Sequence, residues 1–216
     1  MPILNDMVFV HVPKTGGTYI ESLFGLNWNE SHETSKIGHL KNLYGIYEDE
    51  RGKFTLQHLT AEEIRLYFKD EVGDKSMFSV VRNPFERAVS LYHDHKEPLE
   101  LSNFVDFLLL LDERGLSYDF MGWGIGDYYD QIKYHLIPQS DYIFNSVGGV
   151  PILLKYENSN QVNRFLKELG IENPIFGSPR DYNYYKDYLN EKTISLISRI
   201  YHVDFVRLFY SKMYHL

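Results

Sequence analysis

The stretch FVHVPKTGGTYIESLFG, residues 9–25, decides the fold, because a strand pattern passes directly into a helix pattern across a short turn. The apolar run from Met7 to Val12 predicts a buried strand, and the apolar spacing from Thr15 to Phe24 predicts a helix. A lysine and two adjacent glycines stand in the turn between them. Glycine lets a ligand approach the backbone closely, and backbone amides at the start of a helix attract anions. The sequence therefore predicts an anion-binding turn at the end of the first strand.

The turn carries the groups that a phosphate or phosphosulfate requires. Lys14 supplies a positive charge, and the hydroxyls of Thr15 and Thr18 flank the amides of Gly16 and Gly17. The pattern differs from a Walker A loop, in which a glycine directly precedes the lysine. From these residues alone, a tight strand-to-helix turn with an exposed lysine remains the alternative interpretation.

A second strand end repeats the arrangement. SMFSVVR, residues 76–82, predicts a buried strand, and an N-cap pattern at Asn83 opens a helix that runs to about His95. Arg82 ends the strand and Ser90 lies two turns into the helix, so a guanidinium and a hydroxyl are placed to share a second phosphate. The alternative is that Arg82 pairs with a carboxylate and Ser90 only packs.

The remaining patterns predict an α/β fold with a P-loop-like, mostly parallel sheet flanked by helices and a helical C-terminal part. FTLQH, residues 54–58, predicts a third short strand before a capping box at Thr60. We expect the ends of the three strands to meet at one edge of the sheet, where ligands of such folds bind. Further along the chain we expect an irregular lid over 119–139, a strand pair over 141–144 and 151–156, and helices over 102–114, 158–169 and from Asn190.

Composition limits the classes of function. The 216 residues show no internal repeat, which predicts a single domain over 1–216. A net charge of -8 argues against a nucleic-acid partner, and the absence of cysteine excludes disulfides and thiolate metal sites. No apolar run predicts a membrane span and no secretory signal is visible, so we expect a cytoplasmic protein, with a removed N-terminal anchor as the alternative. The sequence does not indicate an oligomeric state.

PKTGGT followed by VVRNPFERAVSLY resembles the PAPS-dependent sulfotransferases, and is closest to a soluble member of the carbohydrate (Golgi-type) branch. The segments QHLTAEEI and HLIPQSDYIF and the C-terminal helical part extend the resemblance over most of the chain. It implies that 3′-phosphoadenosine-5′-phosphosulfate (PAPS) is the donor and adenosine 3′,5′-bisphosphate (PAP) the product, and no motif requires a metal. It also assigns two sets of residues. The 5′-phosphosulfate is assigned to Lys14, Thr15, Gly16, Gly17 and Thr18, and the 3′-phosphate to Arg82 and Ser90.

Sulfuryl transfer to a hydroxyl needs a base, and histidine suits the role because its usual pKa lies near neutral. We expect His58, which matches the central histidine segment of the family, to be the base; a loop histidine bonded to nearby backbone is the alternative. His135 is the second candidate and, with Gln139 and Trp123, a candidate contact to the acceptor. His11 lies within the first strand and is interpreted as structural. The adenine is expected near residues 178–185.

The acceptor is only broadly defined by the sequence as a hydroxyl on a glycan, a lipid or a small metabolite. An acidic chain argues against the long basic cleft that a polysulfated glycan favours. Two other functions remain open: a P-loop kinase or nucleotide hydrolase, which needs magnesium ligands and a Walker lysine, and a PAP- or PAPS-binding module without catalysis.

Overall fold

The computed structural model describes residues 2–26, 34–35, 46–49, 52–116, 128–144, 149–177 and 183–212. Its strands are β1 (Ile3–Leu4), β2 (Met7–Val10), β3 (Thr34–Ser35), β4 (Ile46–Asp49), β5 (Gly52–Thr55), β6 (Met77–Val81) and β7 (Ile152–Lys155). Its helices are α1 (Gly17–Leu23), the 3₁₀ helix η2 (Leu56–His58), α2 (Ala61–Tyr67), α3 (Lys69–Val72), α4 (Pro84–His95), α5 (Phe104–Arg114), α6 (Tyr128–Leu136), α7 (Gln139–Ile143), α8 (Ser159–Glu168), α9 (Asn183–Lys186), α10 (Glu191–Ile200) and α11 (His202–Arg207).

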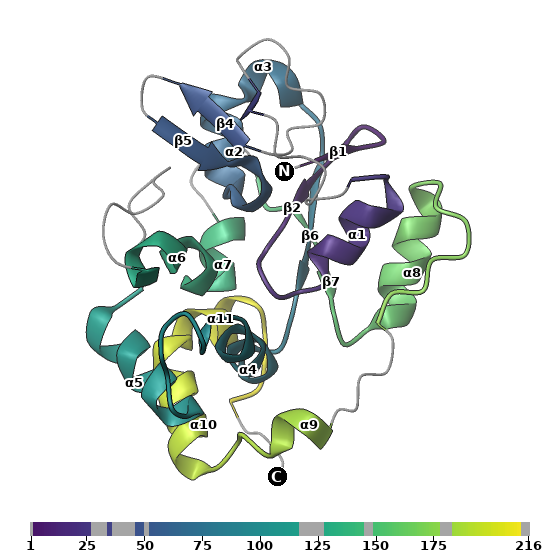
Figure 1. Cartoon of the computed structure of the whole chain (residues 1–216). Coiled ribbons are helices and arrows are strands. Elements are labelled where there is room, and N and C mark those ends of the chain that lie inside the picture. The colour runs from purple at the N-terminus through teal and green to yellow at the C-terminus, as the bar shows by residue number, and fades with distance from the viewer. Residues whose placement is uncertain are drawn as a thin grey trace.

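The main sheet has the strand order β1-β2-β6-β7, and β2, β6 and β7 run parallel (Figure 1). Phe9 of β2 lies opposite Phe78 of β6, which in turn lies opposite Ile152 of β7. Only β1 is antiparallel, and it pairs with β2. The predicted mostly parallel sheet flanked by helices is therefore confirmed. The ends of β2 and β6 lie side by side, which brings the two predicted anion-binding turns together.

Side chains alternate between the two faces of this sheet, as a strand buried on both sides requires. Val8 and Val10 of β2 pack in a core formed with α2, α3 and α7. Phe9 and Phe78 point to the other face and pack against α1 and α8. Figure 1 shows α1 and α8 together on that side of the sheet. Each face of the sheet is thus sealed by helices, which leaves the strand ends as the place for a site.

A third apolar cluster joins α4, α5 and α6 to the C-terminal helices α9, α10 and α11. Phe85 of α4 stacks at a tilt on Phe205 of α11, with ring centroids 4.9 Å apart. Figure 1 shows these helices gathered beyond the point where β6 leads into α4. The predicted helical C-terminal part is present, and it stabilises the helix that follows Arg82. No helix within the described residues is both long and apolar enough to cross a bilayer.

The local capping signals are confirmed where the structure tests them. Asn83 accepts a hydrogen bond from the Phe85 amide, and α4 ends at His95 as predicted. Thr60 and Glu63 form a capping box at the start of α2. Asn190 forms a second capping box, with Thr193, at the start of α10, and Asn158 caps α8 by accepting from the Gln161 amide. Such caps satisfy amides that the first turn of a helix leaves unpaired, and their signal lies within four residues.

Several predicted elements are wrong. Residues 54–58 do not form a strand of the main sheet, because β5 ends at Thr55, pairs with β4 in a separate sheet, and gives way to η2. Residues 141–144 do not pair with β7, because 139–143 form α7 and β7 pairs with β6 instead. Part of the predicted lid is helical, since α6 occupies 128–136. Short apolar runs do not distinguish a strand from a buried helix, and distant partners decide.

Candidate active site

The turn after β2 has a backbone that needs its glycines. Gly16 has a φ of +87°, a left-handed value that a helix does not contain, so α1 begins at Gly17 rather than at the predicted Thr15. A Cβ on Gly17 would lie 2.1 Å from the ring of His11, and one on Gly16 would lie 2.8 Å from the ring of Phe176. The two glycines therefore let aromatic rings pack directly against the turn.

The polar groups of the turn divide into two sets. The hydroxyl of Thr15 is buried and donates to the carbonyl of Val12 at 2.8 Å, so it closes the turn. In contrast, no hydrogen bond among the described residues uses the amides of Gly17 and Thr18, and the side chain of Thr18 is exposed. The amides at the start of α1 are thus available to an external acceptor.

Two arginines from the second strand end hold this turn in place. Arg87 of α4 donates from Nε to the carbonyl of Pro13 at 3.0 Å, and Arg82 donates from Nη1 to the carbonyl of Lys14 at 3.3 Å. Arg87 is 1% exposed and also donates to the carbonyls of Ile137 and His135. Sequence reasoning missed Arg87, although a cation within the apolar pattern of α4 was a signal for it. The two predicted anion-binding turns form one connected structure.

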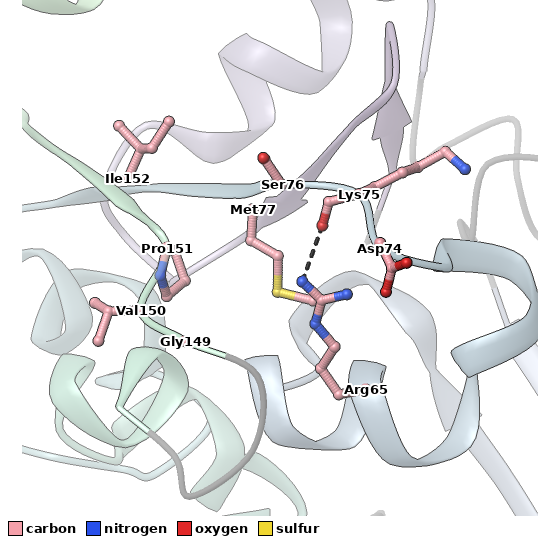
Figure 2. Close-up of a pocket in the computed structure, with 9 residues that line it drawn as sticks. All are labelled: Arg65, Asp74, Lys75, Ser76, Met77, Gly149, Val150, Pro151 and Ile152. Carbon is pink, nitrogen blue, oxygen red and sulfur yellow. Dashed lines mark hydrogen bonds between the residues drawn. The ribbon is translucent and has the colours of Figure 1, made fainter.

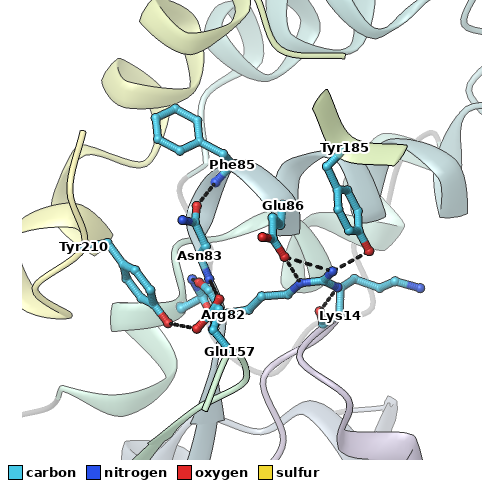
Figure 3. Close-up of polar contacts among 9 residues, drawn as sticks. Lys14, Arg82, Asn83, Phe85, Glu86, Glu157, Tyr185 and Tyr210 are labelled. Carbon is cyan, nitrogen blue, oxygen red and sulfur yellow. Dashed lines mark hydrogen bonds and ion pairs between the residues drawn. The ribbon is translucent and has the colours of Figure 1, made fainter. Parts of the chain in front are cut away.

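The guanidinium of Arg82 has several protein partners (Figure 3). It donates to Glu86 Oε2 from Nη2 at 3.3 Å and also to the hydroxyl of Tyr185. Its central carbon lies over the rings of Tyr156 and Tyr185, 4.5 Å and 4.9 Å from their centroids. Burial raises the pKa of Glu86, and the attraction of Arg82 offsets only part of that rise. Arg82 is therefore both a carboxylate partner and a cation packed against two tyrosine rings.

The face of α4 that carries Ser90 also carries Asp94, the partner of Lys14. The spacing of four residues places Glu86, Ser90 and Asp94 in one row. Asp94 Oδ1 accepts from the Lys14 ammonium at 2.9 Å, with both side chains partly exposed. Ser90 is half-buried between the Glu86 and Asp94 positions. Both ends of this face therefore contact the turn after β2, because Asp94 pairs with the Lys14 ammonium and Arg82 donates to the Lys14 carbonyl.

His58 lies in η2 and packs against His11, whose ring contacts Gly17 of the turn. Its Nδ1 is 3.1 Å from the carbonyl oxygen of His11, which can only accept a hydrogen bond, so Nδ1 carries the proton and Nε2 keeps a lone pair. Its ring centroid is 4.5 Å from that of His11, 4.8 Å from that of His135 and 5.8 Å from that of Tyr134. Burial, with His11 and His135 adding to it, lowers the pKa of His58 well below 6.5. The ring is therefore neutral near pH 7.

A buried polar group supports the position of His11. Glu21 of α1 is fully buried, with Oε1 2.7 Å from His11 Nδ1, and its Oε2 accepts from Gln57 Nε2 at 2.6 Å. Burial raises the pKa of Glu21, but His11 and these hydrogen bonds outweigh it and lower the pKa below 4.5. Sequence reasoning interpreted His11 as structural and missed Glu21. A carboxylate on the buried face of α1 was the available signal.

His135 meets a second histidine as well as His58. Its Nδ1 lies 3.2 Å from Nε2 of His95, the last residue of α4, which is 3% exposed. Burial lowers the pKa of His135 well below 6.5 and that of His95 to about 4, so both rings are neutral near pH 7. The structure therefore brings together His58 and His135, the two predicted bases, and adds His95, which sequence reasoning missed.

A sequence model of the sulfotransferase family matches residues 4–211. The chain belongs to the sulfotransferase family. No curated protein and no solved structure was found to match it. The match covers both strand-end turns, His58 and the C-terminal helices, so the predicted family is confirmed, and its general activity is transfer of a sulfuryl group.

Gln139 of this sulfotransferase braces the end of β6 rather than facing open space. It is fully buried, accepts from the Arg82 amide at 2.8 Å and donates to the Arg82 carbonyl at 2.8 Å. Asp204 accepts from the Gln139 amide at 3.0 Å. Its polar atoms are used within the fold, which favours a structural role. Trp123, also predicted to contact the acceptor, and residues 178–182 of the predicted adenine region lie outside the described residues.

A pocket of about 270 Å³ lies at the opposite edge of the sheet (Figure 2). Ser76 and Pro151, which precede β6 and β7, line it together with Arg65 of α2. Arg65 donates to the carbonyls of Gly73 and Lys75 at 2.7 Å and 2.9 Å, so its guanidinium stabilises the chain entering β6. Ligands of parallel sheets bind beyond the carboxyl ends of the strands. The turns after β2 and β6, rather than this pocket, therefore remain the candidate site.

Proposed function

We propose that this sulfotransferase transfers the sulfuryl group of PAPS to a hydroxyl of a glycan, a lipid or a small metabolite, with His58 as the general base. One observation carries the proposal: His11 contacts both halves of the site. Its ring packs against Gly17 of the anion-binding turn, and its carbonyl fixes the tautomer of His58. A base with its lone pair on Nε2 is thereby held beside the turn proposed to receive the donor.

The donor would occupy both strand-end turns. Lys14 and the amides of Gly17 and Thr18 provide the positive charge and donors for the 5′-phosphosulfate. Arg82 and Ser90 are proposed to hold the 3′-phosphate. Of the five N–H groups of a guanidinium, the hydrogen bonds of Arg82 within the described residues use four, which leaves one on Nη1. The bond from Nη1 to Lys14 makes the two proposed phosphate subsites adjacent.

In the proposed reaction the chain moves one proton and stabilises one charge. PAPS, when bound, supplies the sulfuryl group and leaves as PAP. His58 accepts the hydroxyl proton of the acceptor at Nε2 as that oxygen bonds to sulfur. The Lys14 ammonium and the turn amides stabilise the negative charge that develops on the departing phosphate. His58 then returns the proton to solvent. None of these roles calls for a metal ion.

The direct test separates turnover from donor binding in a His58→Gln variant. Sulfate transfer from labelled PAPS is measured over a panel of sugars, lipids and small alcohols, and PAP affinity is measured by calorimetry. We expect turnover to fall about a hundredfold or more, the usual contribution of a general base, while PAP affinity stays unchanged. His93→Gln, which removes an imidazole bonded to Tyr184, is the matched control.

The same experiment distinguishes the alternatives. Near-normal turnover in His58→Gln, with loss in His135→Gln, would transfer the base role to His135. Binding of PAP without sulfate transfer to any acceptor of the panel would favour a binding module that lacks catalysis. Hydrolysis of ATP with Mg²⁺ and no reaction with PAPS would favour a P-loop nucleotide hydrolase.

A further inference from the structure

Three side chains of the types that bind transition metals meet where α4 ends against α6. Asp94 and His95 are adjacent at the end of α4, and His135 approaches from α6. One ligand atom of each lies within 4.8 Å of the other two. We propose that Asp94, His95 and His135 form a binding site for a divalent transition-metal ion, with Zn²⁺ as the ion that fits its chemistry.

The distances between the nitrogens support this assignment. His95 Nε2 and His135 Nδ1 are 3.2 Å apart. Zinc bound tetrahedrally to two imidazole nitrogens at about 2.0–2.1 Å holds those nitrogens about 3.3 Å apart. Asp94 Oδ2 is 3.8 Å from His95 Nε2, and the Asp94 side chain is 40% exposed, so a small rotation brings the oxygen to the third position. The buried His95 ring and the half-buried His135 ring thus already lie at the spacing that zinc needs, and the exposed carboxylate closes on the ion.

The donor set matches the ion. Two imidazoles and one carboxylate are the kind of three-ligand set that leaves a further position of zinc open. Histidine binds a metal through a ring nitrogen of its neutral imidazole. The chain has no cysteine, which disfavours ions that require thiolates, and imidazole suits zinc.

Lys14 gives the site a property that a chance pair of histidines would lack. The Asp94 carboxylate divides its oxygens, with Oδ1 bound to the Lys14 ammonium and Oδ2 turned to His95. The ammonium competes with a metal dication for the same carboxylate and repels it at short range. Removing the charge of Lys14 should therefore tighten metal binding, whereas a weaker carboxylate should loosen it.

The simpler interpretation is a hydrogen bond between two neutral imidazoles, one donating and the other accepting. That pair needs neither Asp94 nor a metal, and it predicts no zinc affinity. The two interpretations therefore differ in a measurement that uses neither donor nor acceptor, so the metal site stands or falls independently of the proposed sulfuryl transfer.

The experiment is calorimetric titration of the full chain, without a histidine tag, with Zn²⁺, followed by visible absorption with Co²⁺ as a spectroscopic probe. We expect one ion per chain and cobalt bands typical of nitrogen and oxygen ligands. His95→Gln, His135→Gln and Asp94→Asn should each weaken zinc binding about tenfold or more, and Lys14→Met should strengthen it. His93→Gln, two residues before His95 and bonded to Tyr184, should bind zinc as the wild type does.

Each other outcome overturns the site. Absence of zinc binding at micromolar concentrations contradicts it, and so does binding that survives loss of both His95 and His135. An equal loss in His93→Gln would show adventitious surface binding. Asp94→Asn keeps the test decisive if a histidine variant fails to fold, because the Asp94 side chain is 40% exposed. Unchanged zinc affinity in Asp94→Asn, together with unchanged affinity in Lys14→Met, would also contradict the proposal.

Discussion

The turns after β2 and β6 stand side by side but are built in opposite ways. The turn after β2 is shaped by left-handed backbone at Lys14 and Gly16, and its amides at Gly17 and Thr18 bond to nothing among the described residues. In the turn after β6, by contrast, most of the polar groups of Arg82 already have hydrogen-bond partners within the protein. Arg82 alone bonds to Gln139 through its amide and carbonyl, and to carboxylate, hydroxyl and carbonyl partners through its side chain.

This difference separates two kinds of residue in one site. In the first turn, the amides of Gly17 and Thr18 and the partly exposed Lys14 ammonium have few partners inside the folded chain, so these groups are open to a ligand. In the second turn, Arg82 is already hydrogen-bonded to other residues of the protein, so changing it lowers the stability of the fold as well as any affinity for a donor. The predictions below test this separation by measuring the free energy of unfolding beside binding, from the largest expected effect to the smallest.

Arg87→Leu should have the largest effect on stability. The side chain is buried and donates to three backbone carbonyls, including that of Pro13, and the substitution leaves all three without this donor. We expect a loss of about 3 kcal/mol or more in urea unfolding, because a hydrogen bond from a charged group contributes about 1.5–3 kcal/mol. Arg164→Leu, exposed on α8, should change stability by about 0.5 kcal/mol or less. Equal stability of the two variants would contradict the role of Arg87.

Gly17→Ala tests the packing of the first turn. The added Cβ would lie 2.1 Å from the His11 ring, so the ring or the turn must move. We expect a loss of about 2–3 kcal/mol, as for other overpacked sites, together with weaker PAP binding. Thr18→Ala, one position further along α1 and exposed, is the control and should unfold like the wild type. A fully stable Gly17→Ala protein would show that the contact with His11 is not tight.

Arg82→Ala and Lys14→Ala compare the two turns directly. Arg82→Ala leaves the buried Glu86 carboxylate without its partner, and we expect a loss of about 2 kcal/mol. Lys14→Ala removes only a partly exposed ion pair with Asp94, so the unfolding free energy should change by about 0.5 kcal/mol or less. Both should weaken PAP binding in calorimetry. If Lys14→Ala destabilises the chain as much as Arg82→Ala, the contrast between open and committed turns fails.

Glu21→Gln should show a small effect that depends on pH. The pKa of Glu21 lies below its ordinary 4.5, so the ionised carboxylate stabilises the fold above that pH, and the stabilisation is lost as pH falls through the lowered pKa. We expect the variant to be about 1 kcal/mol less stable than the wild type at neutral pH, with a smaller difference below 4.5. Glu97→Gln, exposed after α4, should show no such dependence. A difference that is constant with pH would exclude an ionic role for Glu21.

Local signals made much of this fold predictable. The cap at Asn83 and the full extent of α4 follow from residues that are neighbours in the sequence, as does the turn that begins at Pro13. The pairing of the strands could not be predicted from neighbouring residues, because β7 pairs with β6, which lies about 70 residues earlier in the chain. A strand and a short buried helix can share the same apolar pattern, which is why residues 141–144 were expected to form a strand although α7 covers 139–143.

The site shows the same limit. Lys14 and Arg82 were predicted from the ends of two strands, and the structure joins them through the Lys14 carbonyl. His58 was expected at the end of a third strand, yet it reaches the site from η2, where the carbonyl of His11 fixes it. Contacts such as that between Glu21 and His11 link segments whose proximity no local pattern encodes.

Calorimetric titration of the wild-type chain with PAP and with AMP tests the central claim most directly. The account predicts that PAP binds about tenfold or more tightly than AMP, because the 3′-phosphate adds charge-assisted contacts worth about 1.5 kcal/mol or more. Arg82→Ala should lose that preference while its folded state is verified by circular dichroism. Equal affinities for PAP and AMP would contradict the proposal that the turns after β2 and β6 form one donor site.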